Sequence, residues 1–194
     1  AEPHTAKTWA LLDLAIAVAC GDLWMSRQTT KGKVLIIDEE DSIADLQRRL
    51  SQLLKGRKLS VDDVTQGVDL LPLTGINLSD SKYVEALDLL LAKSKPDVVI
   101  FDSLVRIHTE DEDKAQPMAK ITGILKRLMV THGCSFVLSH HDRKATGKSR
   151  GRPENRFRGS SEIRAFVDSH IDLEPLGKGR FLANHVKLKA GHSV

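Results

Sequence analysis

The sequence predicts an α/β fold: a mainly parallel sheet flanked by helices on both faces, with a β-hairpin near the C-terminus. Short β-branched runs alternate with helical segments of about a dozen residues. The strand-like runs are continuously apolar, as in strands that are buried on both sides of a parallel sheet. Two further strand-like segments, 169–176 and 181–189, are joined by the turn sequence GKGR and predict the hairpin.

The first helix and the first strand are predicted from their apolar character. Residues 7–20 (KTWALLDLAIAVAC) are apolar almost all round, which favours a buried helix, and Gly21 is a stop signal. KVLIID at 33–38 is a short β-branched run typical of a buried parallel strand.

The middle of the chain predicts helices and strands in turn. Asp41 and Ser42 cap a helix over 42–54 that closes at Gly56. PDVVIFDS at 96–103 is the strongest strand signal, because it is apolar up to its terminal acid. The other expected elements are a short polar helix at 61–66, a strand at 69–73, helices at 81–94 and 116–132, and a strand at 134–141.

The alternation breaks at residues 142–161. DRKATGKSRGRPENRFRGSS has no apolar periodicity, and we expect a mobile basic loop over 142–159. A short helix at 161–168 precedes the hairpin. The length of 194 residues predicts a single domain over 1–194. Because no strand precedes the first helix, we expect this domain to be short at its N-terminal end, and we expect it to be short at its C-terminal end as well.

Composition narrows the class of protein. Apolar residues make up 41% and charged residues 28% of the 194, which is ordinary for a soluble globular chain. No apolar run approaches the ~20 residues that a membrane-spanning helix needs, so we expect no membrane partner. Cys20 and Cys134 are interpreted as small buried hydrophobes. Neither has a C-x-x-C partner, which fits a reducing cytoplasm.

Acids, serines and histidines follow three of the predicted strands. In an open parallel sheet, ligands bind outside the carboxyl ends of the strands. Each such residue alone is typical of a solvated turn or a helix cap; together they predict a polar rim. These residues are Asp38, Glu39, Glu40 and Asp41 after KVLII, Asp102 and Ser103 after PDVVIF, and Ser139, His140 and His141 after CSFVL.

The first eight residues, AEPHTAKT, have the spacing of the phosphate-binding loop G-x-x-x-x-G-K-[ST]. Ala1 and Ala6 replace its glycines, whereas Lys7 and Thr8 are in place. In this loop the lysine reaches phosphates and the hydroxyl holds Mg²⁺. Alanine in a left-handed conformation costs about 1–2 kcal/mol, which weakens phosphate binding without necessarily abolishing it.

The rim supplies the other groups that phosphoryl chemistry requires. Asp102 fits the acid at a strand end that serves the metal, and Glu40 fits the carboxylate that positions water. His140 fits the polar group that contacts the γ-phosphate.

Five segments in this order resemble the RecA-like P-loop ATPases of the hexameric replicative-helicase group, above all the plasmid RepA type (AAA_25-like). They are AKTW, LIIDEEDS, VVIFDSLVRIH, VLSHHDRK and FRGSSEIRAFVDS. The resemblance spans nearly the whole chain and implies a RecA-like P-loop NTPase that uses ATP and Mg²⁺ as a hexameric ring or filament. It implies that Glu40 is the catalytic glutamate, that His140 is the γ-phosphate sensor, and that Lys187 and Lys189 reach a neighbouring subunit. The implied nucleotide contacts are Pro3, His4, Thr5, Ala6, Lys7, Thr8, Trp9 and Asp102, of which Thr8 and Asp102 hold Mg²⁺.

The basic loop predicts a partner as well. A run of this kind is also typical of a solvated loop, but it directly follows the sensor strand, where RecA-like helicases place their DNA loops. Its cations would neutralise phosphates of single-stranded DNA, and Phe157 could stack on a base. Arg158 and Arg164 could instead be fingers that reach a neighbour's γ-phosphate. The cations are Arg143, Lys144, Lys148, Arg150, Arg152, Arg156 and Arg158.

Three functions remain open at this point. The first is an ATP-hydrolysing RecA-like domain, such as a helicase or translocase, acting on single-stranded DNA. The second is a RecA-fold regulatory module that binds nucleotide weakly or not at all, as the substitutions at Ala1 and Ala6 favour. The third is an ATPase whose substrate is a protein.

Overall fold

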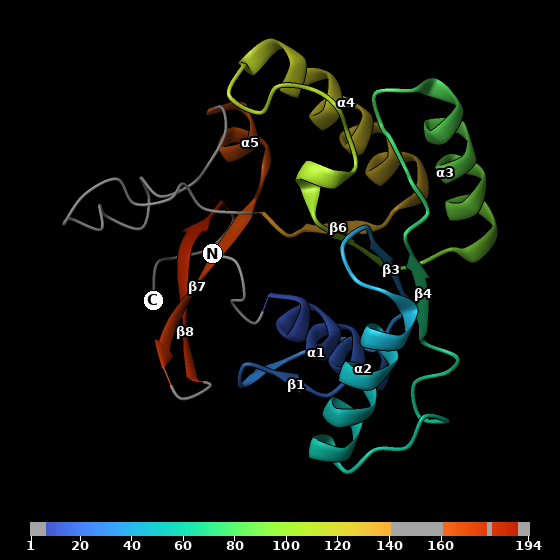
Figure 1. Cartoon of the computed structure of the whole chain (residues 1–194), viewed down its shortest axis with the longest axis vertical. Coiled ribbons are helices and arrows are strands. Elements are labelled where there is room, and N and C mark those ends of the chain that lie inside the picture. The colour runs from blue at the N-terminus through green and yellow to red at the C-terminus, as the bar shows by residue number, and fades with distance from the viewer. Residues whose placement is uncertain (1–6, 141–160, 178–179, 190–194) are drawn as a thin grey trace. The chain divides into compact units, whose positions relative to one another are not determined.

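The computed structural model describes residues 7–140, 161–177 and 180–189 (Figure 1). The chain divides into two compact units, which we describe one at a time. The sheet unit comprises Thr8–Thr109 and Ile124–Ser139, and the hairpin unit takes in Glu110–Gly123 and the chain from His140 onward, together with the N-terminal residues up to Lys7. The basic loop expected at 142–159 lies outside the described residues.

Four parallel strands form the sheet of the first unit, in the order β4-β3-β5-β6. The central pair, β3 and β5, is in register, so that Ile36 lies beside Ile100 and Asp38 beside Asp102. The predicted parallel sheet is therefore confirmed. The strands are β3 (Val34–Asp38), β4 (Val68–Pro72), β5 (Val98–Asp102) and β6 (Ser135–Leu138).

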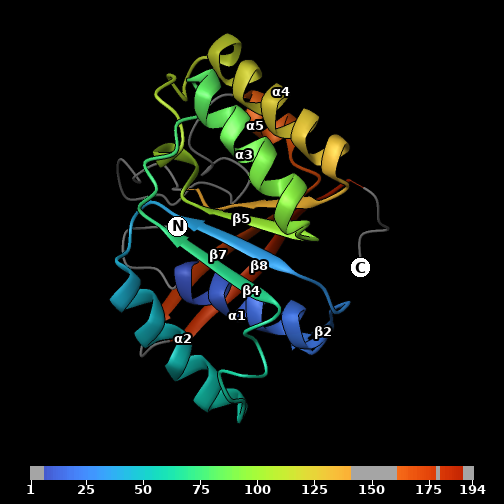
Figure 2. The same ribbon diagram turned by 90° about the vertical axis from the view of Figure 1, so that its right-hand side faces the viewer.

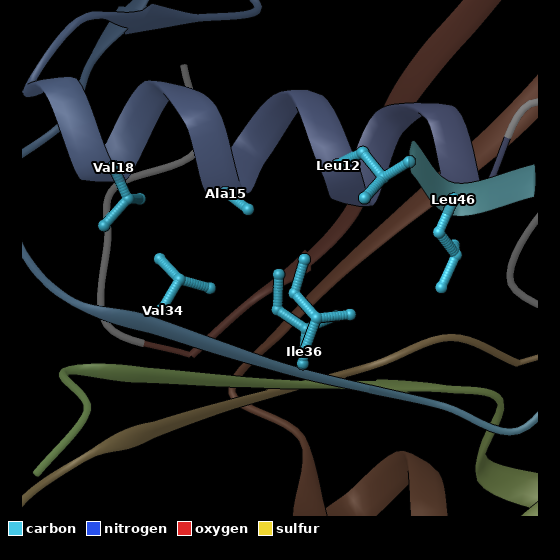
Figure 3. Packing of buried hydrophobic residues seen from close by; sticks show 7 residues of the cluster. Leu12, Ala15, Val18, Val34, Ile36 and Leu46 are labelled. Atoms are coloured by element: carbon cyan, nitrogen blue, oxygen red, sulfur yellow. The ribbon is translucent and has the colours of Figure 1, made fainter. Parts of the chain in front are cut away.

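Helices cover both faces of this sheet (Figure 2). Leu12, Ala15 and Val18 of α1 point toward Val34 and Ile36 of β3 (Figure 3). The opposite face carries α3 and the second half of α4, which are joined by a 2.8 Å contact between His132 and Asp88. The helices are α1 (Lys7–Cys20), α2 (Ile43–Arg57), α3 (Ser81–Ser94) and α4 (Ala115–His132).

The start of α2 differs from the prediction. Ser42 is its N-cap and accepts a hydrogen bond from the N–H of Asp45. Asp41 does not cap the helix; its carboxylate instead forms an ion pair with Arg49, two turns further on. The side chain of the acid before the cap is therefore bound to the second turn of the helix.

The end of α2 differs as well, because the helix continues through Gly56 to Arg57. The Arg57 guanidinium donates to Asp13 at 2.7 Å and to Asp22 at 2.9 Å, which fixes the additional residues. Lys58 then ends the helix in a left-handed conformation, with φ 60°.

Three local features were wrong or missed in the sequence prediction. Residues 61–67 form consecutive turns in place of the expected short helix. The two-residue strands β1 (Leu23–Trp24) and β2 (Arg27–Gln28) form a small hairpin that was not predicted. Cys20 is partly exposed, whereas Cys134 is buried as expected.

The hairpin unit contains the predicted antiparallel pair of strands. β7 (Ser169–Gly177) pairs with β8 (Arg180–Leu188) with two register shifts, and the short helix α5 (Ser161–Phe166) precedes them. The hairpin is thus confirmed, and α5 is shorter than expected. Within the described parts of the chain, the helices fall short of the combined length and apolarity that crossing a bilayer requires.

Candidate functional site

Thr8, Asp102 and Ser139 meet at the carboxyl ends of the central strands. The Thr8 hydroxyl of α1 donates to Oδ2 of Asp102 at 2.6 Å, across 94 positions of sequence. The Ser139 hydroxyl, just after β6, donates to Oδ1 of the same carboxylate at 2.5 Å. Asp102 is 1% exposed, so these two hydroxyls fix a buried carboxylate in one orientation.

Glu40 lies at the same rim and is exposed. The buried hydroxyl of Ser103, the residue after Asp102, donates to Oε1 of Glu40 at 2.5 Å. A carboxylate that is exposed to solvent and oriented by a hydrogen bond is placed to orient a water molecule.

The neighbouring Glu39 is engaged differently. Its carboxylate accepts hydrogen bonds from the N–H groups of Thr74 and Gly75, both at 3.0 Å, and from the Thr74 hydroxyl. Glu39 therefore anchors the loop after β4, and of the two glutamates Glu40 is the one presented to solvent.

Asp38, the last residue of β3, is buried beside Asp102. Its Oδ1 accepts from the N–H groups of Glu40 at 2.9 Å and Asp41 at 2.7 Å. Burial is the largest cause that raises the pKa of Asp38 from 3.8 to about 6, opposed by these two hydrogen bonds and supported by the negative charge of Asp102.

Backbone hydrogen bonds connect the ends of neighbouring strands. The N–H of Glu39 donates to the carbonyl of Asp102, and the N–H of Leu73 donates to the carbonyl of Asp38, both at 2.7 Å. On the other side, the N–H of Leu104 donates to the carbonyl of Ser139 at 2.9 Å. The functional side chains thus stand on backbone that is fixed from strand to strand.

The paired hydroxyl and carboxylate of Thr8 and Asp102 fit a Mg²⁺ site. Both are oxygen donors, the type that Mg²⁺ prefers. Among the described residues, no group of three or more acids, histidines or cysteines is placed to hold a metal ion by itself. This suits Mg²⁺ that is bound through one or two protein oxygens together with the phosphates of a nucleotide.

Lys7 and His140 belong to the hairpin unit and are the chain neighbours of Thr8 and Ser139. Lys7 is the first described residue of α1, so it stands at a helix N-terminus. The His140 imidazole lies 3.6 Å from the Glu112 carboxylate, and both side chains are more than nine-tenths buried. The sequence did not single out Glu112.

Three of the candidate DNA or finger residues lie in the described part of the hairpin unit: Arg164, Lys187 and Lys189. Lys187 donates to the carbonyls of Arg164 and Val167, both at 2.6 Å, and so caps the end of α5. Lys189 forms an exposed ion pair with Asp168 at 3.2 Å, and Arg164 is exposed. Their finger roles remain predictions. The other DNA or finger candidates lie outside the described residues: Arg143, Lys144, Arg156 and Arg158. The predicted nucleotide contacts Pro3, His4, Thr5 and Ala6 lie outside them too.

Asp38, Ser103 and Ser139 are among the rim residues that received no role from the sequence. All three directly end or follow a strand of the parallel sheet, and this position was the available signal. Serine has no diagnostic spacing, and Asp38 is one of four consecutive acids, so their partners became clear only from the fold.

Comparison with protein families agrees with this geometry. The family model of AAA_25, described as an AAA domain, matches residues 1–147. The match includes the segment before α1 and all four strands of the parallel sheet. Such a domain indicates ATP binding at a phosphate-binding loop. The chain therefore belongs to the AAA_25 family of AAA domains.

Proposed function

We propose that this chain is a RecA-like domain that binds and hydrolyses ATP. The observation that carries the proposal is the Thr8–Asp102–Ser139 cluster, which brings a hydroxyl from the first turn of α1 to a buried strand-end carboxylate. A hydroxyl and an acid in this relation serve Mg²⁺ and nucleotide phosphates in P-loop proteins. Membership of an AAA domain family supports the same reaction.

In the proposed site, Lys7 binds the phosphates, while Thr8 and Asp102 hold Mg²⁺. When bound, Mg²⁺ neutralises charge on the phosphate oxygens. Lys7 adds a positive charge at the N-terminus of α1, where the helix dipole also favours an anion. Pro3, His4, Thr5, Ala6 and Trp9 are the other proposed contacts of the nucleotide.

Glu40 orients the attacking water. It is exposed at the rim, and the hydrogen bond from Ser103 fixes the orientation of its carboxylate, as a group that places a water molecule requires. Glu39 is less suited to this role because its two oxygens already accept hydrogen bonds from the loop after β4.

Single-stranded DNA is the proposed partner, and a hexameric ring or filament is the proposed assembly. The support is the basic segment 143–158, which directly follows the sensor candidate His140. In this role His140 couples contact with the γ-phosphate to the segment that binds DNA, and Arg164, Lys187 or Lys189 contacts a neighbouring subunit.

ATP turnover by the full chain, with and without single-stranded oligonucleotide, tests the proposal. Lys7→Ala should remove turnover, because the phosphates lose the lysine that binds them. Glu40→Gln should remove it as well, because general-base assistance alone contributes about 10²–10⁴-fold. Glu39→Gln is the matched control: its amide oxygen can still accept from the N–H and hydroxyl of Thr74, and only the contact with the Gly75 N–H is lost, so turnover should stay near the wild-type level. Equal rates in wild type, Lys7→Ala and Glu40→Gln would overturn the catalytic assignment.

Ala1 and Ala6 favour one further candidate, a regulatory module with weak nucleotide binding. A chain without turnover that binds an oligonucleotide in a salt-dependent manner would support this candidate. Turnover that ignores DNA at every salt concentration would instead favour a protein substrate.

A further inference from the structure

Asp38 has no part in the proposed reaction, although it ends one of the two central strands. It is 1% exposed and lies directly beside Asp102 in the register of β3 and β5. Within the described part of the chain, its Oδ2 is buried without a hydrogen-bond partner. An ionisable side chain in such a place is costly, so a purely structural explanation is weak.

The other oxygen of Asp38 organises the turn that carries Glu40. Oδ1 accepts hydrogen bonds from the N–H groups of both Glu40 and Asp41, at 2.9 and 2.7 Å. Two backbone donors on one carboxylate oxygen fix the path of the chain between β3 and the N-cap of α2 at Ser42.

Glu40 is therefore held at two points. Ser103 fixes its carboxylate through one hydrogen bond, and Asp38 fixes its backbone nitrogen through another. Both supports come from buried residues at the ends of the two central strands, β5 and β3. A group that must place a water molecule gains from such support, since a misplacement of about 1 Å can cost on the order of 10²-fold in rate.

We propose that Asp38 is the positioning residue for Glu40. It acts through the accepting oxygen Oδ1, which sets the backbone of the turn. The proposal rests on the proposed function of Glu40 as the residue that orients water.

Amide hydrogen exchange and kinetics on Asp38→Ala and Asp38→Asn test the proposal. In Asp38→Ala the N–H groups of Glu40 and Asp41 lose their acceptor and should exchange faster, while those of Ile36 and Ile100 in the sheet stay protected. kcat should fall by about 10-fold or more with little change in KM, because the phosphate-binding residues are untouched. Asp38→Asn keeps an accepting oxygen and should restore both the protection and most of kcat.

Two further variants sharpen the test. Asp63→Ala removes a similar carboxylate brace, which accepts from the N–H and hydroxyl of Ser60, and should leave kcat unchanged. In the double variant with Glu40→Gln, Asp38→Ala should cause no further loss of the residual kcat in single-turnover measurements, since the residue that it positions is already disabled.

Unchanged exchange at Glu40 and Asp41 in Asp38→Ala would overturn the proposal, as would faster exchange with an unchanged kcat. The exchange measurement needs no nucleotide. If the wild-type chain shows no turnover, the proposed function is overturned. The exchange measurement would still decide whether Asp38 holds the turn.

Discussion

β3 of the sheet unit and β8 of the hairpin unit are both strands, but they bury their residues very differently. All five residues of β3 are buried, whereas none of the nine in β8 is. At the end of β3, Asp38 supports the residues that follow it; on β8, Lys187 caps the short helix α5 and Lys189 forms a surface ion pair. The chemistry at the strand ends can thus be argued from contacts within the sheet unit. The role of the hairpin instead depends on a binding partner, such as the proposed neighbouring subunit.

The largest expected effect is on the free energy of unfolding, which a substitution in β3 should lower far more than one in β8. Ile36→Ala should lower the free energy of unfolding by about 2–5 kcal/mol, because Ile36 is buried between the sheet and α1. Leu182 on β8 is 45% exposed, so Leu182→Ala should change the free energy of unfolding by less than about 0.5 kcal/mol. Urea unfolding of both variants measures the difference, and similar losses would contradict it.

The second prediction concerns Asp38 and pH, in the presence of a chelator. Its native pKa, about 6, lies above its ordinary value of 3.8, so the folded chain binds this proton more tightly than the unfolded chain. Wild-type stability should therefore fall as pH rises through about 4 to 6, by up to about 3 kcal/mol.

Asp38→Asn removes this titration and should flatten that part of the pH profile. It should also be more stable than wild type at neutral pH. Urea unfolding in steps across the window is the measurement, and a variant with the wild-type slope would show that another group is responsible.

The third prediction concerns the metal. Asp102→Asn should raise the Mg²⁺ concentration for half-maximal turnover by about 10–100-fold, because the side chain loses its negative charge and one of the two oxygens that Thr8 and Ser139 orient. Asp45→Asn, at an exposed ion pair on α2, is the control and should keep the wild-type Mg²⁺ dependence.

The smallest effects compare the two lysines of β8. Lys187→Ala should cost about 1 kcal/mol, because two carbonyls at the end of α5 lose their donor. Lys189→Ala should cost less than about 0.5 kcal/mol, since its ion pair is exposed. Thermal unfolding measures both. A loss of turnover in Lys189→Ala without a loss of stability would indicate a finger role at a neighbouring subunit.

Apolar patterning was enough to predict the central strands of the sheet and two of the helices that cover it. The bounds of α1 and α3 agree with the sequence, and the central strands agree to within one or two residues. The order of the motifs also indicated Thr8, Glu40 and Asp102. The bounds of these helices and strands could be predicted because each element carries its apolar pattern in its own residues.

Contacts between distant segments explain the errors. α2 passes Gly56 because Arg57 meets Asp13, 44 positions earlier, which local patterning does not contain. Ser103 gains its role because β5 lies beside β3, which Glu40 follows, and Ser139 gains its role because β6 lies beside β5. Four consecutive acids follow one strand, and only the fold separates the turn brace Asp38 and the loop anchor Glu39 from the exposed Glu40.

The most direct test of the nucleotide site is calorimetric titration of the full chain with a non-hydrolysable ATP analogue and Mg²⁺. We predict binding that requires Mg²⁺ in wild type and in Glu40→Gln, and its loss in Lys7→Ala and Thr8→Ala. The absence of heat with wild type at millimolar analogue would contradict an ATP site at the rim formed by Thr8 and Asp102.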